Sequence, residues 1–102
     1  VTVEPELFSP DNDGEKDVVN ISYKFDDPGF VGTITIYDAK GRLIKSLLQN
    51  ELLGTSGTYS WDGVTEENER ARIGIYIIYF EVFGLNGEIK QFKKTCVLAA
   101  NL

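Results

Sequence analysis

Short runs of alternating apolar and polar residues, separated by turn-forming residues, recur along this chain. The first clear run places its apolar residues at every second position: Val19, Ile21, Tyr23 and Phe25. A period of two puts one face of a strand inward. The run ends at Asp26–Gly29, because proline has no ladder donor and glycine tolerates positive φ. This pattern predicts an all-β chain and excludes a helical bundle.

The following segments repeat the same pattern. Ile34 and Ile36 alternate with threonines, which suit a pleated surface. Residues 38–41 form a predicted hairpin turn with Gly41 in the left-handed position, and Arg42–Leu48 is the predicted return strand. Residues 49–58 are irregular and glycine-rich, so we expect a loop that crosses between two sheets.

The second half of the chain contains the most apolar run. Along residues 75–83 the even positions carry no charged residue, whereas the odd positions include Glu81. We therefore expect the even side chains to point inward. A helical turn at residues 66–69 could form, but four residues cannot sustain a helix alone. The elements predicted here are a strand at Gly57–Trp61, a loop at Asp62–Ile73, a strand at Ile75–Phe83, a turn at Leu85–Gly87 and a strand at Glu88–Leu98.

These elements predict about seven strands, no helix and one domain over residues 1–102. Strands at this spacing indicate an antiparallel β-sandwich with Greek-key crossings, and a closed barrel is the competing architecture. A chain of this length can bury a single core without metal or disulfide. The lone Cys96 cannot form an internal disulfide.

The charge of the chain argues against a nucleic-acid partner, and its hydropathy argues against a membrane-spanning helix. The net charge is −6, and all of it falls within residues 1–30, which hold eight acids and two lysines. Nucleic acid needs a basic footprint, so we expect no nucleic-acid partner. The longest wholly apolar stretch, Ile75–Phe80, has six residues. A membrane-spanning helix needs about 20, so no membrane span is expected.

Residues for catalysis are scarce. The chain has no histidine, the most common general base and metal ligand. Serine–histidine and cysteine–histidine nucleophile pairs are therefore excluded. Cys96 lies within a strand pattern, with Phe92 and Leu98 on its face, so we expect a small buried side chain. The sequence predicts a protein that is not an enzyme and needs no cofactor.

One acidic turn offers chemistry for a metal. Its acids stand at alternate positions: Asp11, Asp13, Glu15 and Asp17. Carboxylates spaced in this way can converge on Ca²⁺, and Gly14 permits a sharp turn, so Asp11, Asp13 and Asp17 are candidate metal ligands. An EF-hand loop is excluded, because Asn20 would replace its bidentate glutamate. The favoured alternative is a turn whose side chains hydrogen-bond their own backbone.

Trp61, Asp62 and Gly63 form a second notable group. An exposed Trp61 could stack on a sugar, but a single tryptophan in a small sandwich is more often core. We expect the Asp62 carboxylate to accept backbone N–H groups of the following loop. Gly74 is expected to permit a close approach. The ring of Tyr76 is expected to enter the core while its hydroxyl finds a partner at the edge.

Four motifs in order give the chain a family resemblance: Phe-Ser-Pro-Asp-Asn-Asp-Gly at 8–14, Ile-x-Ile-Tyr-Asp-x-x-Gly-Arg-Leu at 34–43, Trp-Asp-Gly at 61–63 and Gly-Ile-Tyr-Ile at 74–77. The chain resembles a bacterial Ig-like family over residues 7–98. That family includes the Ig-like domain of the flagellar hook-capping protein, type IX secretion C-terminal sorting domains and gliding-motility-associated C-terminal domains, some of them in lamin-tail-domain surface proteins.

The resemblance implies an Ig-like sandwich that forms the C-terminal module of a larger protein, secreted or held on the cell surface of a Gram-negative bacterium. It implies sorting by the outer-membrane secretion machinery, with the last strand as the recognised element through Lys93, Lys94, Val97 and Leu98. It also allows a structural or assembly spacer that contacts only neighbouring domains of its own chain. A module that binds Ca²⁺ or glycans is the third alternative.

Overall fold

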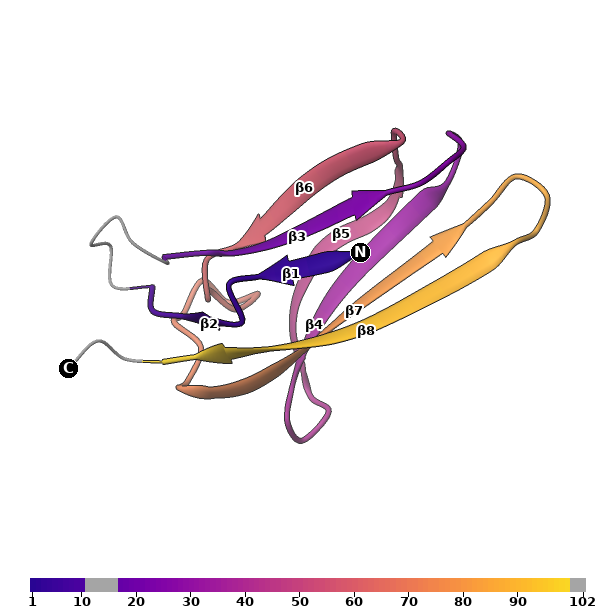
Figure 1. Cartoon of the computed structure of the whole chain (residues 1–102). Coiled ribbons are helices and arrows are strands. Elements are labelled where there is room, and N and C mark those ends of the chain that lie inside the picture. Colours follow the sequence, from indigo (N-terminus) through magenta and orange to yellow (C-terminus); the bar gives the residue numbers. More distant parts are fainter. Residues whose placement is uncertain (11–16, 100–102) are drawn as a thin grey trace.

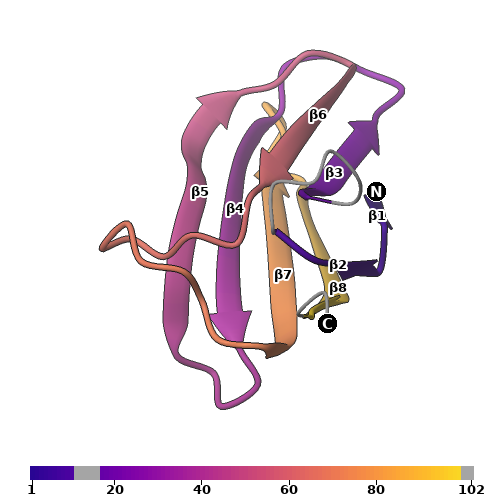
Figure 2. The same cartoon turned by 90° about the vertical axis from the view of Figure 1, so that its left-hand side faces the viewer.

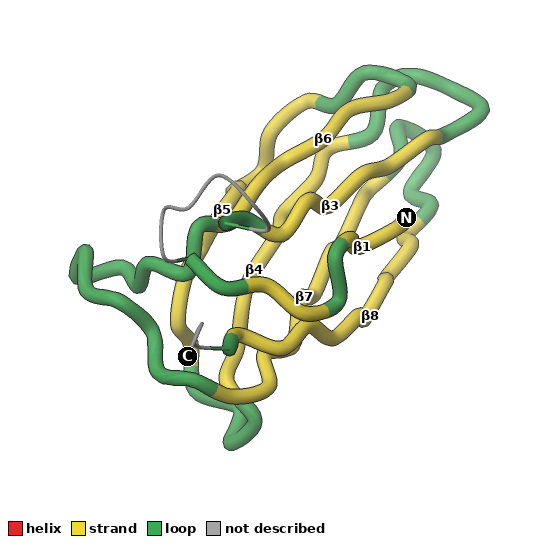
Figure 3. The backbone as a smooth tube through the Cα atoms, turned by 60° about the vertical axis from the view of Figure 1, so that its left-hand side comes forward, coloured by secondary structure: helices red, strands yellow, loops and turns green. Residues whose placement is uncertain are grey.

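The computed structural model describes residues 1–10 and 17–99. These residues form strands joined by loops and turns, and no part of them is helical (Figure 3). The strands, labelled in Figure 1, are β1 (Thr2–Glu4), β2 (Leu7–Phe8), β3 (Val19–Lys24), β4 (Val31–Asp38), β5 (Leu43–Leu52), β6 (Ser56–Trp61), β7 (Gly74–Phe83) and β8 (Ile89–Leu98).

The strands form two sheets that face each other (Figure 2). One sheet has the order β1-β3-β6 and the other the order β2-β8-β7-β4-β5. The chain changes sheet after β1, β2, β3, β5 and β6, and such crossings are typical of a Greek-key sandwich. The predicted fold class, an Ig-like β-sandwich, is confirmed.

The structure adds two details to the predicted antiparallel sandwich of about seven strands. The described residues contain eight strands, and β2 runs parallel to β8, with Leu7 opposite Val97 and Phe8 opposite Leu98. The reason is that the first strand is divided between the sheets. β1 pairs with β3, and the chain then crosses at residues 5–6 to lie along β8.

The loop predicted at residues 49–58 is wrong at both ends. β5 continues to Leu52, and β6 begins at Ser56, so only three residues cross between the sheets. Register shifts between β4 and β5 break the alternation of β5, and Asn50 has a φ of 46°. The end of β5 lies at a sheet edge and is exposed, so the polar residues 49–51 can belong to a strand.

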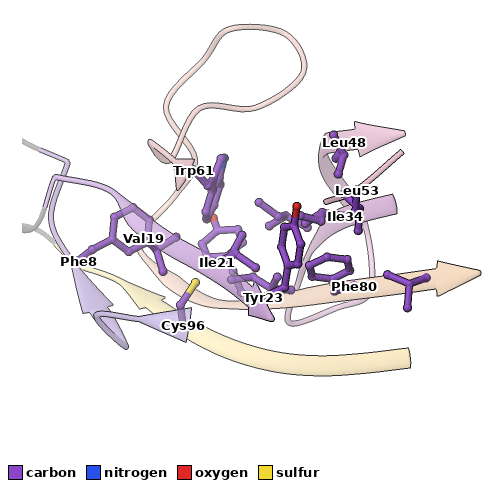
Figure 4. Close-up of a cluster of buried hydrophobic side chains, with 14 of the residues drawn as sticks. Phe8, Val19, Ile21, Tyr23, Ile34, Leu48, Leu53, Trp61, Phe80 and Cys96 are labelled. Carbon is purple, nitrogen blue, oxygen red and sulfur yellow. The ribbon is translucent and has the colours of Figure 1, made fainter. Parts of the chain in front are cut away.

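The core lies between the two sheets (Figure 4). The even side chains of β7 are all buried, as predicted: Tyr76, Ile78, Phe80 and Val82. They face Val19, Ile21 and Tyr23 of β3, with Trp61 at the end of β6. Trp61 is fully buried and pairs in register with Val19. The aromatic and β-branched residues therefore supply the apolar surface that holds the sheets together.

Candidate functional site

The segment between β6 and β7, residues 62–73, is anchored at both ends by core aromatic residues. The Nε1–H of Trp61 donates to the carbonyl oxygen of Val64 at 2.9 Å. The hydroxyl of Tyr76 donates to the carbonyl oxygen of Arg72 at 2.6 Å. Asp62 accepts a hydrogen bond from the N–H of Val64 at 3.1 Å. These contacts confirm the predicted roles of Trp61, Asp62 and Tyr76.

The two glycines of this region act differently. Gly63 is buried with a φ of 82°, and a β-carbon there would lie 3.1 Å from a methyl group of Leu98. Gly63 is therefore required for both conformation and space. The close approach predicted at Gly74 is wrong, because no atom lies within 4 Å of a β-carbon built there. Its φ of 157°, which side chains rarely permit, is the reason that glycine suits this position.

The burial of Trp61 bears on the glycan alternative. Stacking on a sugar ring requires an exposed indole face. Trp61 has no exposed surface, and its ring contacts Phe8 and Tyr76, with centroid separations of 5.6 Å and 5.1 Å. Trp61 is therefore a core residue, as expected, and the alternative of a sugar contact through its ring is excluded.

The predicted calcium ligands are only partly described. Asp11 and Asp13 lie outside the described residues, and Asp17 is a half-buried residue just before β3. Within residues 1–10 and 17–99, no three acidic, cysteine or histidine side chains lie close enough to hold a metal. Calcium binding by Asp11, Asp13 and Asp17 stays a prediction.

The last strand separates its predicted signal residues into two groups. Lys93 and Lys94 are exposed, whereas Leu98 is buried and Val97 is half-buried. The end of β8 is held by β2, because the N–H of Val97 donates to Glu6 and the N–H of Ala99 donates to Phe8. Ile89–Thr95 has no paired strand on the side away from β7 in the described part of the chain. The lysines thus lie beside an open strand edge.

Cys96 is the single thiol, and it points into the core beside β2 and β3 (Figure 4). Burial raises the pKa of the Cys96 thiol from 9.0 to about 11. The thiolate is the reactive form of cysteine. Its neutral state at physiological pH makes Cys96 a packing residue, in agreement with the sequence analysis.

The role of Glu66 was not predicted from the sequence. Residues 66–69 form no helix, as expected, and the loop reaches the outer edge of β5. The N–H of Glu66 donates to the carbonyl oxygen of Ile44, and its carboxylate accepts the N–H of Ser46 at 2.5 Å. Glu66 therefore covers part of an open sheet edge. No local sequence pattern predicts this contact, because it joins the loop before β7 to β5, about 20 residues earlier in the chain.

Comparisons with known proteins support the fold. A scan against protein-family models found no match, and a search of curated proteins also found none. Among solved structures, CopC from Methylosinus trichosporium OB3b is similar, with a TM-score of 0.55 and 18% sequence identity. The alignment covers 100% of this chain and 95% of CopC. At this identity the likeness shows a shared β-sandwich fold.

The described part of the chain contains no helix able to cross a lipid bilayer.

Proposed function

We propose that this β-sandwich is a non-enzymatic C-terminal module of an exported bacterial surface protein, and that it directs sorting and attachment through type IX secretion. The proposal places the module outside the cytoplasm, at the surface of a Gram-negative cell. Its partner is the outer-membrane secretion machinery. The motif order at residues 8–14, 34–43, 61–63 and 74–77 motivates this assignment.

The observation that carries the proposal is the geometry of β8. Its first seven residues present an open edge, and an extended segment of a partner can pair with such an edge by adding a strand. Lys93 and Lys94 are exposed beside that edge. Successive strand residues point to opposite faces, so the two lysines place positive charge on both sides of the edge.

The end of β8 has a second role in this proposal. Leu98 packs in the core and Val97 pairs with Leu7, so the end of the strand is fixed to the domain. A fixed end keeps the lysine-bearing edge in one register. We therefore assign recognition to Lys93 and Lys94, and positioning to Val97 and Leu98.

A reporter fusion tests the proposal. Residues 1–102 are fused to the C-terminus of a periplasm-directed reporter, in a host with the type IX machinery and in a strain that lacks it. The reporter should reach the surface only in the first strain. A reporter that stays in the periplasm of both strains would rule out sorting by this module.

A structural spacer is the second candidate, and the shape of the molecule favours it. The molecule is elongated, with principal extents of 48, 26 and 20 Å. Such a body can separate neighbouring domains of its own chain. A spacer would give no export of the reporter in either strain while leaving the fusion folded, which a protease-protection assay would report.

A further inference from the structure

A cleft lies at one end of the sandwich, between the β4–β5 hairpin and the segment that leads into β7. Its volume is about 530 Å³, within the range of ligand sites in proteins. Its apolar lining includes Leu43, Ile73 and Ile75, and these side chains are 57%, 67% and 54% exposed. Aliphatic side chains exposed beside a hollow are the kind of surface that a partner covers.

The cleft is basic in an otherwise acidic chain. Its lining includes four basic side chains and two acidic ones: Lys40, Arg42, Arg70, Arg72, Asp38 and Glu69. This surplus of positive charge contrasts with the net charge of −6 for the whole protein. A surplus of one sign of charge in a cleft attracts ligands of the opposite sign.

Two of these six charged side chains, Asp38 and Arg42, already form an ion pair with each other. Asp38 accepts Arg42 Nε–H at 2.8 Å and the backbone N–H groups of Lys40 and Arg42, each at 2.9 Å. These hydrogen bonds, led by the backbone N–H of Arg42, lower the pKa of Asp38. Asp38 and Arg42 therefore neutralise each other. In the described ranges, no ion pair engages Lys40, Arg70 or Arg72.

Arg70 and Arg72 both line the cleft. Ala71 between them is half-buried and packs against the core, whereas both arginines are exposed. Arg70 pairs with Val64 in a β-bridge, and the carbonyl oxygen of Arg72 accepts the hydroxyl of Tyr76. The backbone that carries the two guanidinium groups is thus fixed at both residues.

We infer that this cleft binds an extended acidic peptide segment of another protein, with carboxylates at alternate positions and apolar side chains between them. The guanidinium groups of Arg70 and Arg72 pair with two successive carboxylates, because arginine binds carboxylates in a bidentate manner. The apolar side chains of the peptide cover Leu43, Ile73 and Ile75. A peptide can contact both the basic side chains and the exposed aliphatic side chains of the cleft, whereas a small anion would contact only the basic ones.

This inference is independent of the sorting role proposed for β8. The cleft uses the loop before β7 and the β4–β5 hairpin, and it includes no residue of β8. The export assay and the peptide-binding assay can therefore fail separately.

A fluorescent pentapeptide of sequence Asp-Leu-Asp-Leu-Asp tests the inference, with Asn-Leu-Asn-Leu-Asn as its neutral counterpart. Fluorescence anisotropy should show binding of the acidic peptide that weakens as salt increases. Arg70→Glu and Arg72→Glu should each weaken binding by about tenfold or more. Lys24→Glu makes the same charge change at the end of β3, away from the cleft, and should leave the affinity unchanged.

Several results would overturn the inference. Equal affinity for the neutral peptide would remove the carboxylate pairing, and equal weakening by Lys24→Glu would indicate only long-range attraction. Displacement of the probe by an equimolar amount of inorganic phosphate would reassign the cleft to a small anion. A dimer that Arg72→Glu dissociates would reassign it to a second copy of this chain. Arg70→Gln and Arg72→Gln serve as substitutes if the reversed charges unfold the domain.

Discussion

The indole of Trp61 packs edge-on against the ring of Tyr76, with centroids 5.1 Å apart and planes at 65°. Each ring also donates a hydrogen bond to one end of the connecting segment, Trp61 to Val64 and Tyr76 to Arg72. The same two side chains therefore fill the core and hold the loop that frames the basic cleft. Packing inside the sandwich and the geometry of its surface are coupled at this pair.

Replacing Trp61 by alanine should remove the largest fully buried side chain of the core. A buried tryptophan truncated to alanine costs about 3–5 kcal/mol, so we expect a strongly destabilised or unfolded domain. Urea denaturation followed by circular dichroism measures the loss. Trp61→Phe keeps a ring but loses the bond to Val64, and should cost less. A Trp61→Ala variant that melts with the wild type would refute the core assignment.

Tyr76→Phe keeps the buried ring and removes only the hydroxyl that bonds to Arg72. The loss of one such hydrogen bond should lower the free energy of unfolding by about 0.5–1.5 kcal/mol. Tyr79→Phe is the matched control, because the hydroxyl of Tyr79 bonds only to the carboxylate of Glu81 at 3.2 Å. Equal effects of the two substitutions in denaturant titrations would mean that the Arg72 contact contributes no more than the bond between Tyr79 and Glu81.

The strands that could be predicted from the sequence are those in which every second side chain is buried, because burial then requires apolar residues at alternate positions. β7 alternates buried residues with more accessible ones from Tyr76 onward, and β3 does so from Val19, so the sequence pattern predicts the buried face of each strand. The turn at residues 38–41 was also readable, because Gly41 has a φ of 82° and its N–H bonds to Asp38. The buried face of a strand and a glycine with positive φ can therefore be predicted from the sequence alone.

The missed features depend on contacts between distant segments. β1 and β2 are too short to show a period, and β2 exists only because β8 offers it an edge. Residues 49–51 are polar and residues 49–52 are all exposed, so the end of β5 resembles a loop. The basic cleft joins residues 38–44 to residues 65–76, and nothing local in either segment marks it as half of a site.

Removing the carboxylate of Glu66 should uncover the outer edge of β5. Glu66→Ala leaves the N–H of Ser46 without the acceptor it has in the fold, and exposed sheet edges pair with other chains. We expect self-association that grows with concentration, measured by light scattering after size-exclusion chromatography. Glu67→Ala changes the same charge next to it and should remain monomeric. Identical behaviour of both variants would show that Glu66 does not protect the edge.

Stability at alkaline pH should depend on Cys96. The folded thiol has a pKa raised to about 11, above the 9.0 of an unperturbed thiol, so the unfolded chain loses this proton first. The contribution of the thiol is fully present below pH 9.0 and is lost as pH rises through about 11. From about pH 8 to about pH 10.5, the wild type should lose more stability than Cys96→Ala, measured by denaturant titration at each pH. A parallel decline would contradict this burial effect.

The surface fraction of a fused reporter, compared between the wild-type module and its Lys93→Glu/Lys94→Glu variant, tests the proposed function most directly. Both lysines are exposed on β8, so the variant should fold like the wild type, which its melting temperature verifies. We expect the wild-type fusion at the cell surface and the variant in the periplasm. A variant exported as efficiently as the wild type, or a wild-type fusion that never leaves the periplasm, would contradict recognition through β8.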